Sequence, residues 1–202
     1  MTQPPQLLLP GEAQDPPSGL SYPLALRRRG FSVPVTVFGA LLAFSAFALV
    51  VPAVSAVVLR LGFLLRGGGD FAEYSAAASA YELPEGPAAG HLALAALIPL
   101  SILLVRYVHG VRPRWLASVQ PGLRWRYLGM SLVVAAVILN AFTWASFLAG
   151  DMPVFHDGQD GWVWFLLVVT VTSPLQAAAE EVFFRGYLLQ VIGSATGRAW
   201  AG

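Results

Sequence analysis

Long runs of apolar residues dominate the sequence, and the longest of them restricts the fold most strongly. Residues 31–59 are 29 consecutive residues without a charged side chain. A helix rises about 1.5 Å per residue, so this run is long enough to cross a bilayer core of about 30 Å with some tilt. Pro34 falls in the first turn, where proline is tolerated, whereas Pro52 is interior and is expected to kink the helix. The run therefore predicts a transmembrane helix.

Three further apolar segments predict three more transmembrane helices. They cover about residues 91–105, 127–149 and 162–190. Hydrophobic residues make up 56% of the chain and charged residues only 11%, which is too few to give a core of this size a polar surface. We therefore expect an all-α fold, a polytopic integral membrane helix bundle whose four transmembrane helices are part of a larger bundle.

The remaining segments divide the chain into a tail and one membrane domain. Residues 1–29 contain six prolines and no periodic pattern, which predicts a disordered cytoplasmic tail. Residues 30–202 form the membrane domain. Within it, Asp70 has the position of a helix cap, and the apolar residues after it predict a short helix over about 70–81. That helix could lie in the membrane interface or belong to an ordinary surface loop.

The arginines predict how the spans are oriented. Three arginines lie in the tail and five in residues 106–126, so both segments are expected on the cytoplasmic side. Residues 60–90 carry two arginines and four acids, and residues 150–161 carry three acids, so both should face outward. The arginines follow the membrane edges and form no basic face, which argues against nucleic-acid binding. The chain has no cysteine, which excludes disulfides, thiolate catalysis and cysteine metal sites.

The fourth span ends in a segment that contains three charged residues, Glu180, Glu181 and Arg185. Each would cost about 2.5–3.5 kcal/mol at the centre of a bilayer, so a compensating partner or a function is expected. Glu181 and Arg185 are four residues apart with the acid first, the favourable order for an ion pair on one helix face. Glu180 is then left without an obvious partner in its own helix.

An unpaired carboxylate in an apolar site takes up a proton more readily than one in water. This is the property of a general base that activates a water molecule. Pro174 follows several hydroxyl residues and is expected to loosen the helix just before the charged segment, and Gly186 would let a neighbouring helix approach closely. A structural alternative remains, in which Glu181 and Arg185 form a plain helix-end pair among the lipid headgroups and Glu180 reaches out to water.

Residues 180–188, Glu-Glu-Val-Phe-Phe-Arg-Gly-Tyr-Leu, resemble the E-E-x-x-F-R-G-x-L signature of the CPBP intramembrane proteases. This family includes the type II CAAX prenyl proteases, proteins like lysostaphin resistance protein A, and bacteriocin-immunity members. The resemblance implies an endopeptidase of the bacterial plasma membrane that cleaves membrane-associated peptides or proteins. It implies that Glu180 activates the attacking water and that Glu181 and Arg185 shape the site. The resemblance also implies membrane lipids as partners.

The resemblance implies a glutamate-dependent mechanism without a cofactor. A divalent metal such as zinc is the less favoured alternative, because no cluster of metal ligands is visible in the sequence. The family pattern continues with two further helices that carry histidines. Here the histidines His91, His109 and His156 all precede the signature, and we expect them to be interfacial rather than catalytic. We therefore expect that the C-terminal helices of the family are missing and that this chain alone is inactive.

Two other functions remain open. The chain could be a non-catalytic membrane immunity or scaffold protein that uses the pair Glu181–Arg185 for helix packing. A small transporter with Glu180 as proton carrier is weaker, because no inverted repeat is present. Replacing Glu180 by glutamine separates an enzyme from a scaffold, since the amide keeps the size and hydrogen bonding of the side chain but not its basicity.

Overall fold

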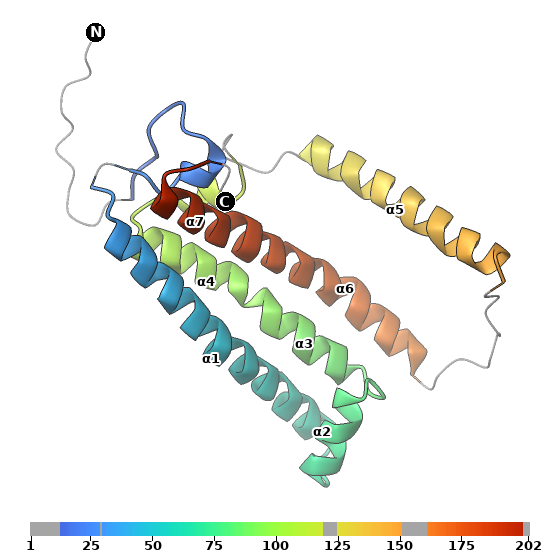
Figure 1. The fold of residues 1–202 in the computed structure, drawn as a ribbon. Helices are drawn as coiled ribbons and strands as arrows, with labels where there is room; N and C mark the ends of the chain where they lie inside the picture. The colour runs from blue at the N-terminus through green and yellow to red at the C-terminus, as the bar shows by residue number, and fades with distance from the viewer. Residues whose placement is uncertain (1–12, 29, 119–124, 151–160, 200–202) are drawn as a thin grey trace.

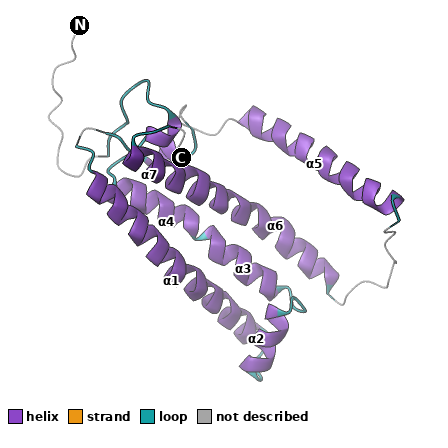
Figure 2. Cartoon of the chain, viewed as in Figure 1, coloured by secondary structure: helices purple, strands orange, loops and turns teal. Residues whose placement is uncertain are grey.

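In a computed structural model of the protein, residues 13–28, 30–118, 125–150 and 161–199 are described. Regular structure in these ranges is helical (Figures 1 and 2), which confirms the expected all-α class. The described residues contain no strand, only an isolated β-bridge between Gln14 and Val111. In chain order the elements are η1 (Tyr22–Leu24), α1 (Val33–Leu65), α2 (Phe71–Ser79), α3 (Glu85–Ala95), α4 (Leu97–Leu103), η2 (Leu104–Val108), η3 (Pro113–Leu116), α5 (Trp125–Leu148), α6 (Trp162–Glu180), η4 (Glu181–Leu188) and α7 (Leu189–Thr196).

Four helices in the described residues are long and apolar enough to cross a membrane, as the sequence predicted. They are Val33–Leu65, Glu85–Val108, Trp125–Leu148 and Trp162–Thr196. Most large apolar side chains on them are exposed, which fits contact with lipid rather than water. The second span begins at Glu85 and not near residue 91, because the carboxylate of Glu85 is paired with Arg66 at a distance of 2.6 Å.

Prolines affect the spans in different ways. The second span is divided between α3 and α4 just before Pro99, which has no N–H to bond a carbonyl in the preceding turn. In contrast, α1 continues without interruption through Pro52, and α6 continues through Pro174. The kink expected at Pro52 stays a prediction.

Three rods of helix lie side by side (Figure 1): α1, then α3 with α4, then α6 with α7. The chain runs through α1 in one direction and through the other two rods in the opposite direction. Helix α5 lies apart from them in Figure 1, and none of its side chains is buried. One end of the three rods, called the signature end here, holds α7 and residues 109–118. The other end, called the α2 end, holds α2 and the start of α6.

Residues 13–28, called the N-terminal arm here, pack on the signature end, so the predicted disorder is wrong for them. The hydroxyl of Tyr22 donates to the carbonyl of Leu116 at 2.5 Å, and Nε of Arg27 donates to the carbonyl of Ser194 at 2.8 Å. Three apolar side chains of the arm are buried: Ala13, Ala25 and Leu26. These contacts come from distant parts of the chain, which a composition rich in proline does not reveal. Residues 1–12 and 29 lie outside the described residues.

At the α2 end, the predicted cap and short helix are confirmed. The side chain of Asp70 accepts hydrogen bonds from the backbone N–H groups of Ala72 and Glu73, at 2.7 and 3.4 Å. These bonds satisfy two of the free donors at the start of α2. The rings of Phe71 and Tyr74 then pack against Phe63, with centroids 5.3 and 5.5 Å apart, which joins α2 to α1.

The buried apolar core gathers at the signature end. It combines one arm residue with residues of α1, of the second span, of the segment after that span and of the fourth span, listed as Leu26, Ala43, Leu97, Leu104, Val105, Val111, Leu116, Ala179, Phe183, Tyr187 and Val191. The largest fully buried side chains among the described residues, Tyr187 and Phe183, belong to the signature. The buried core therefore holds the segment that carries the charged residues.

Candidate functional site

The signature lies where the fourth span widens from an α-helix into a π-helix. Helix α6 ends at Glu180, η4 is the π-helical segment Glu181–Leu188, and α7 continues the same rod. A π-helix forms i→i+5 hydrogen bonds, is rare, and is often found at functional sites. A second π-helical segment, η2, ends the second span. The widening corrects the expectation of one regular helix over residues 162–190.

Phe183, Gly186 and Tyr187 form the buried face of η4, whereas Phe184 is 47% exposed. Phe183 and Tyr187 are fully buried, and η4 packs against α4 and η3. A Cβ on Gly186 would lie 3.2 Å from the carbonyl oxygen of Leu116, so the missing side chain allows η3 to approach closely. The close approach predicted for Gly186 is therefore confirmed.

Glu181 and Arg185 lie on the opposite, open face of η4. Nη1 of Arg185 is 3.1 Å from Oε1 of Glu181, and the two side chains are 77% and 58% exposed. The predicted ion pair is confirmed. This ion pair connects two turns of one helix. Within the described residues, neither Glu181 nor Arg185 forms an ion pair with another helix. Its charges point toward space that the described helices leave uncovered.

Glu180 has a different setting from Glu181. Its side chain is half-buried, and its Oε1 accepts a hydrogen bond from Nε2 of Gln176 at 3.1 Å. The prediction that Glu180 has no partner in its own helix is therefore wrong. The sequence signal was present, because Gln176 lies one helical turn earlier on the same face. The amide of Gln176 therefore fixes the position of one oxygen of the Glu180 carboxylate.

His109 is buried and contacts the signature directly. It follows η2 at the end of the second span, where it was expected, and only 5% of it is exposed. Its Nε2 lies 3.0 Å from the hydroxyl of Tyr187. Burial, and next the positive charge of Arg28, lower the pKa of His109 to about 4, so the imidazole is neutral at neutral pH.

His91 also bonds to the fourth span, away from the charged residues. Its Nδ1 lies 2.8 Å from Oγ1 of Thr172, and that hydroxyl donates to the carbonyl of Val168 at 2.7 Å. Since the hydroxyl has one proton, Nδ1 of His91 is the donor toward Thr172. Among the described residues, neither His91 nor His109 has a hydrogen bond to Glu180 or Glu181, and His156 lies outside those residues.

Within the described ranges, no group of three or more histidine, aspartate or glutamate residues is placed to hold a metal ion. The expectation of a glutamate-dependent site without a metal stays a prediction, because residues outside those ranges are not covered by that finding.

Comparison with known proteins gives one weak similarity. The chain is 27% identical over 103 residues to an uncharacterized protein of Bacillus subtilis strain 168, YyaK. The similarity covers 49% of this chain and 34% of that relative, so the chain spans about a third of the relative's length. No family model matches the chain, and no solved structure is similar to it.

Proposed function

We propose that this chain carries the water-activating part of an intramembrane endopeptidase of the CPBP type. One observation supports this most strongly: two adjacent carboxylates have different settings at the end of one span. Glu180 is half-buried with an amide donor, whereas Glu181 is neutralised by Arg185. Neighbouring carboxylates with different environments are the usual arrangement for dividing catalytic and structural roles.

In the proposed reaction, the water oxygen attacks the carbonyl carbon of a peptide bond while Glu180 accepts a proton from that water. A carbon–oxygen bond forms, the carbon–nitrogen bond breaks, and the proton passes to the leaving amine. Arg185 lies on the open face of η4 and would stabilise the negative charge that develops on the carbonyl oxygen of a substrate, while Glu181 holds its guanidinium in place. The substrate class is a peptide or protein segment that reaches the site from the membrane.

The proposal places this site at the cytoplasmic end of the spans. The signature end holds the N-terminal arm and residues 106–116, whose arginines favour the cytoplasmic side. Glu180 lies 18 residues after Trp162, about 27 Å along a straight helix, which is toward that side of the bilayer. We propose a bacterial plasma membrane as the location.

The proposal is tested with the native gene product reconstituted in lipid vesicles. A membrane-anchored fluorogenic peptide is supplied in water enriched in ¹⁸O. We expect the protein to cleave it and to place one ¹⁸O atom in the new carboxylate. Absence of cleavage across a peptide library, or cleavage without ¹⁸O incorporation, would contradict the proposal.

The scaffold alternative is not favoured by the position of the ion pair. A pair used for helix packing would bridge two helices, whereas Glu181 and Arg185 belong to adjacent turns of η4 and are largely exposed. Exposed pairs of this kind contribute only about 0.3–0.5 kcal/mol in water.

A further inference from the structure

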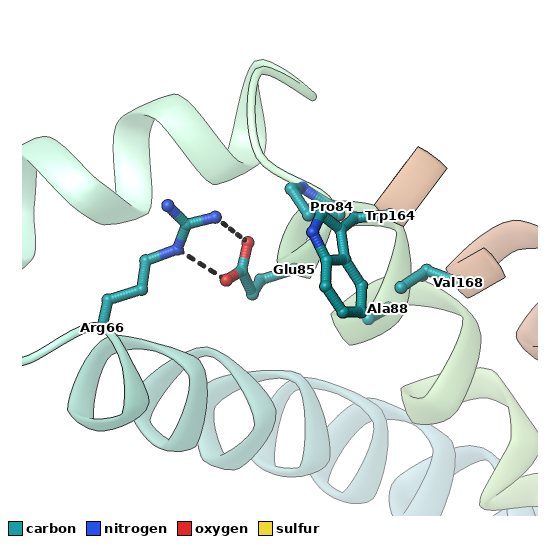
Figure 3. A pocket seen from close by; sticks show the side chains of 6 residues that line it. All are labelled: Arg66, Pro84, Glu85, Ala88, Trp164 and Val168. Carbon is teal, nitrogen blue, oxygen red and sulfur yellow. Dashed lines mark hydrogen bonds and ion pairs between the residues drawn. The ribbon is translucent and has the colours of Figure 1, made fainter. Parts of the chain in front are cut away.

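A second site lies at the α2 end of the bundle, at the other end of the rods from Glu180 (Figure 3). A cleft of about 320 Å³ is lined by residues of three spans: Arg66, Pro84, Glu85, Ala88, Trp164 and Val168. Arg66 directly follows the first span, Glu85 begins the second, and Trp164 lies in the first turn of the fourth. The cleft therefore lies at the ends of three helices that are long and apolar enough to cross a membrane, which is the level expected for lipid headgroups.

The cleft presents both signs of charge. Nε and Nη2 of Arg66 donate to the two carboxylate oxygens of Glu85 at 2.6 and 3.0 Å, as the dashed lines in Figure 3 show. A guanidinium has five N–H donors, so three remain for a ligand, and the carboxylate oxygens can accept further bonds. The side chains of Arg66 and Glu85 are 45% and 21% exposed, so a ligand can reach both.

Apolar side chains continue the cleft beside this ion pair. In Figure 3 the indole of Trp164 lies next to Glu85, with Pro84, Ala88 and Val168 around it. Trp164 is 66% exposed, and tryptophan is enriched at membrane interfaces because its ring is amphipathic. The face of an indole also attracts an ammonium group. The cleft thus combines a cation, an anion and an aromatic face with a surface that suits hydrocarbon.

We propose that this cleft binds the headgroup of a phospholipid that carries a primary amine, such as phosphatidylethanolamine. Its phosphate accepts hydrogen bonds from the free N–H groups of Arg66, and its ammonium donates to Glu85 beside the ring of Trp164. The acyl chains follow Ala88 and Val168 into the bilayer. An anionic headgroup without an amine would bring a phosphate to the Arg66–Glu85 pair but no ammonium to donate to the carboxylate of Glu85. A lipid is favoured over a peptide because the cleft lies at headgroup depth.

The site is independent of the proposed peptidase function, and its test measures binding alone. The whole chain is purified in detergent and titrated with phosphatidylethanolamine, phosphatidylcholine or phosphatidylglycerol of identical acyl chains, with bound lipid counted by native mass spectrometry. We expect phosphatidylethanolamine to bind about tenfold more tightly than either of the others, because only its headgroup joins a phosphate to an N–H donor.

Two variants and one control make the test specific. Glu85→Gln should abolish the preference for the amine lipid, and Trp164→Ala should weaken binding of all three lipids while leaving the Arg66–Glu85 pair intact. Arg60→Ala is the control, because Arg60 lies at the same end but stacks over Phe71, 4.5 Å from the ring centroid, and not over the cleft. Thermal unfolding of each variant shows whether it folds. Equal binding of the three lipids, tighter binding of a peptide, or a preference that survives both Glu85→Gln and Trp164→Ala would overturn the proposal.

Discussion

His109 and Tyr187 lie 78 positions apart in the chain, yet Nε2 of the imidazole is 3.0 Å from the phenol oxygen. Both side chains are buried, and the pair joins the end of the second span to the π-helical segment of the signature. The backbone carbonyl of His109 in turn accepts a hydrogen bond from Nε of Arg28 at 2.5 Å. The N-terminal arm, the end of the second span and the fourth span therefore meet at His109.

The buried state of His109 predicts a pH-dependent stability. Its pKa is about 4 in the folded protein and 6.5 ordinarily, so between these values the unfolded chain binds more protons than the folded one. The contribution of His109 to the free energy of unfolding is therefore fully present above about pH 6.5. It falls by about 3 kcal/mol as the pH drops to about 4. Unfolding in detergent between pH 4 and 8 measures this. His109→Gln should flatten the slope and the control His91→Gln should not; equal slopes in His109→Gln and wild type would contradict the account.

Gly39 is predicted to be required for the His109–Tyr187 contact. A Cβ at this position of α1 would lie 2.6 Å from Nε2 of His109 and 2.9 Å from the hydroxyl of Tyr187, so both side chains would have to move. Gly39→Ala should therefore destabilise the protein by about 1–3 kcal/mol, the usual cost of overpacking. Gly90→Ala is the matched control, because nothing lies within 4 Å of its Cβ position. A melting temperature for Gly39→Ala equal to that of Gly90→Ala would count against this packing.

Asp15 is predicted to hold the N-terminal arm in place. Its carboxylate accepts hydrogen bonds from Arg114 at 2.5 Å, Trp115 at 2.8 Å and Arg112 at 2.7 Å. The hydrogen bond from Arg114 is the largest of the effects that hold the pKa of Asp15 below its ordinary value of 3.8. The stabilisation by Asp15 is therefore fully present above pH 3.8 and is lost as the pH falls through the pKa of the folded protein. Asp15→Asn should speed amide hydrogen exchange in residues 13–28 at neutral pH, whereas Glu73→Gln should not. Unchanged exchange in Asp15→Asn would show that the arm is held otherwise.

The hydroxyl of Thr172 is predicted to stabilise the packing of α3 against α6. Thr172→Val keeps the shape of the side chain but leaves Nδ1 of His91 without its acceptor, which should cost about 1–3 kcal/mol for a half-buried donor. Thr170→Val serves as the control, because Thr170 is exposed on the same helix. Thermal unfolding compares the two variants, and equal stability would argue that the bond contributes nothing.

The four spans could be predicted from the sequence because each needs only a long apolar run, and the lipid side of a helix requires no specific partner. The pair Glu181–Arg185 was predictable for a similar reason, since its spacing of four residues is local. The cap at Asp70 is also a local pattern. Each of these features depends on residues that are near one another in the chain.

The features that could not be predicted depend on residues far apart in the chain. The packing of residues 13–28 requires partners near residues 110–118 and 194, and the His109–Tyr187 contact joins different spans. The π-helical segment has no composition of its own that distinguishes it from α-helix, and its buried residues Phe183 and Tyr187 pack against distant parts of the chain. The hydrogen bond from Gln176 to Glu180 is different, because the two residues are only four positions apart. The sequence prediction considered charged partners for Glu180 and not a neutral donor.

The central claim is that Glu180 is the base that activates water, and one substitution tests it most directly. The native gene product is compared with its Glu180→Gln variant for hydrolysis of the membrane-anchored peptide, with Glu73→Gln as a control at the α2 end. The account predicts that Glu180→Gln folds normally, keeps the hydrogen bond partner Gln176, and loses turnover by a factor of about 10²–10⁴, while the control retains it. Hydrolysis by Glu180→Gln at the wild-type rate would contradict the claim.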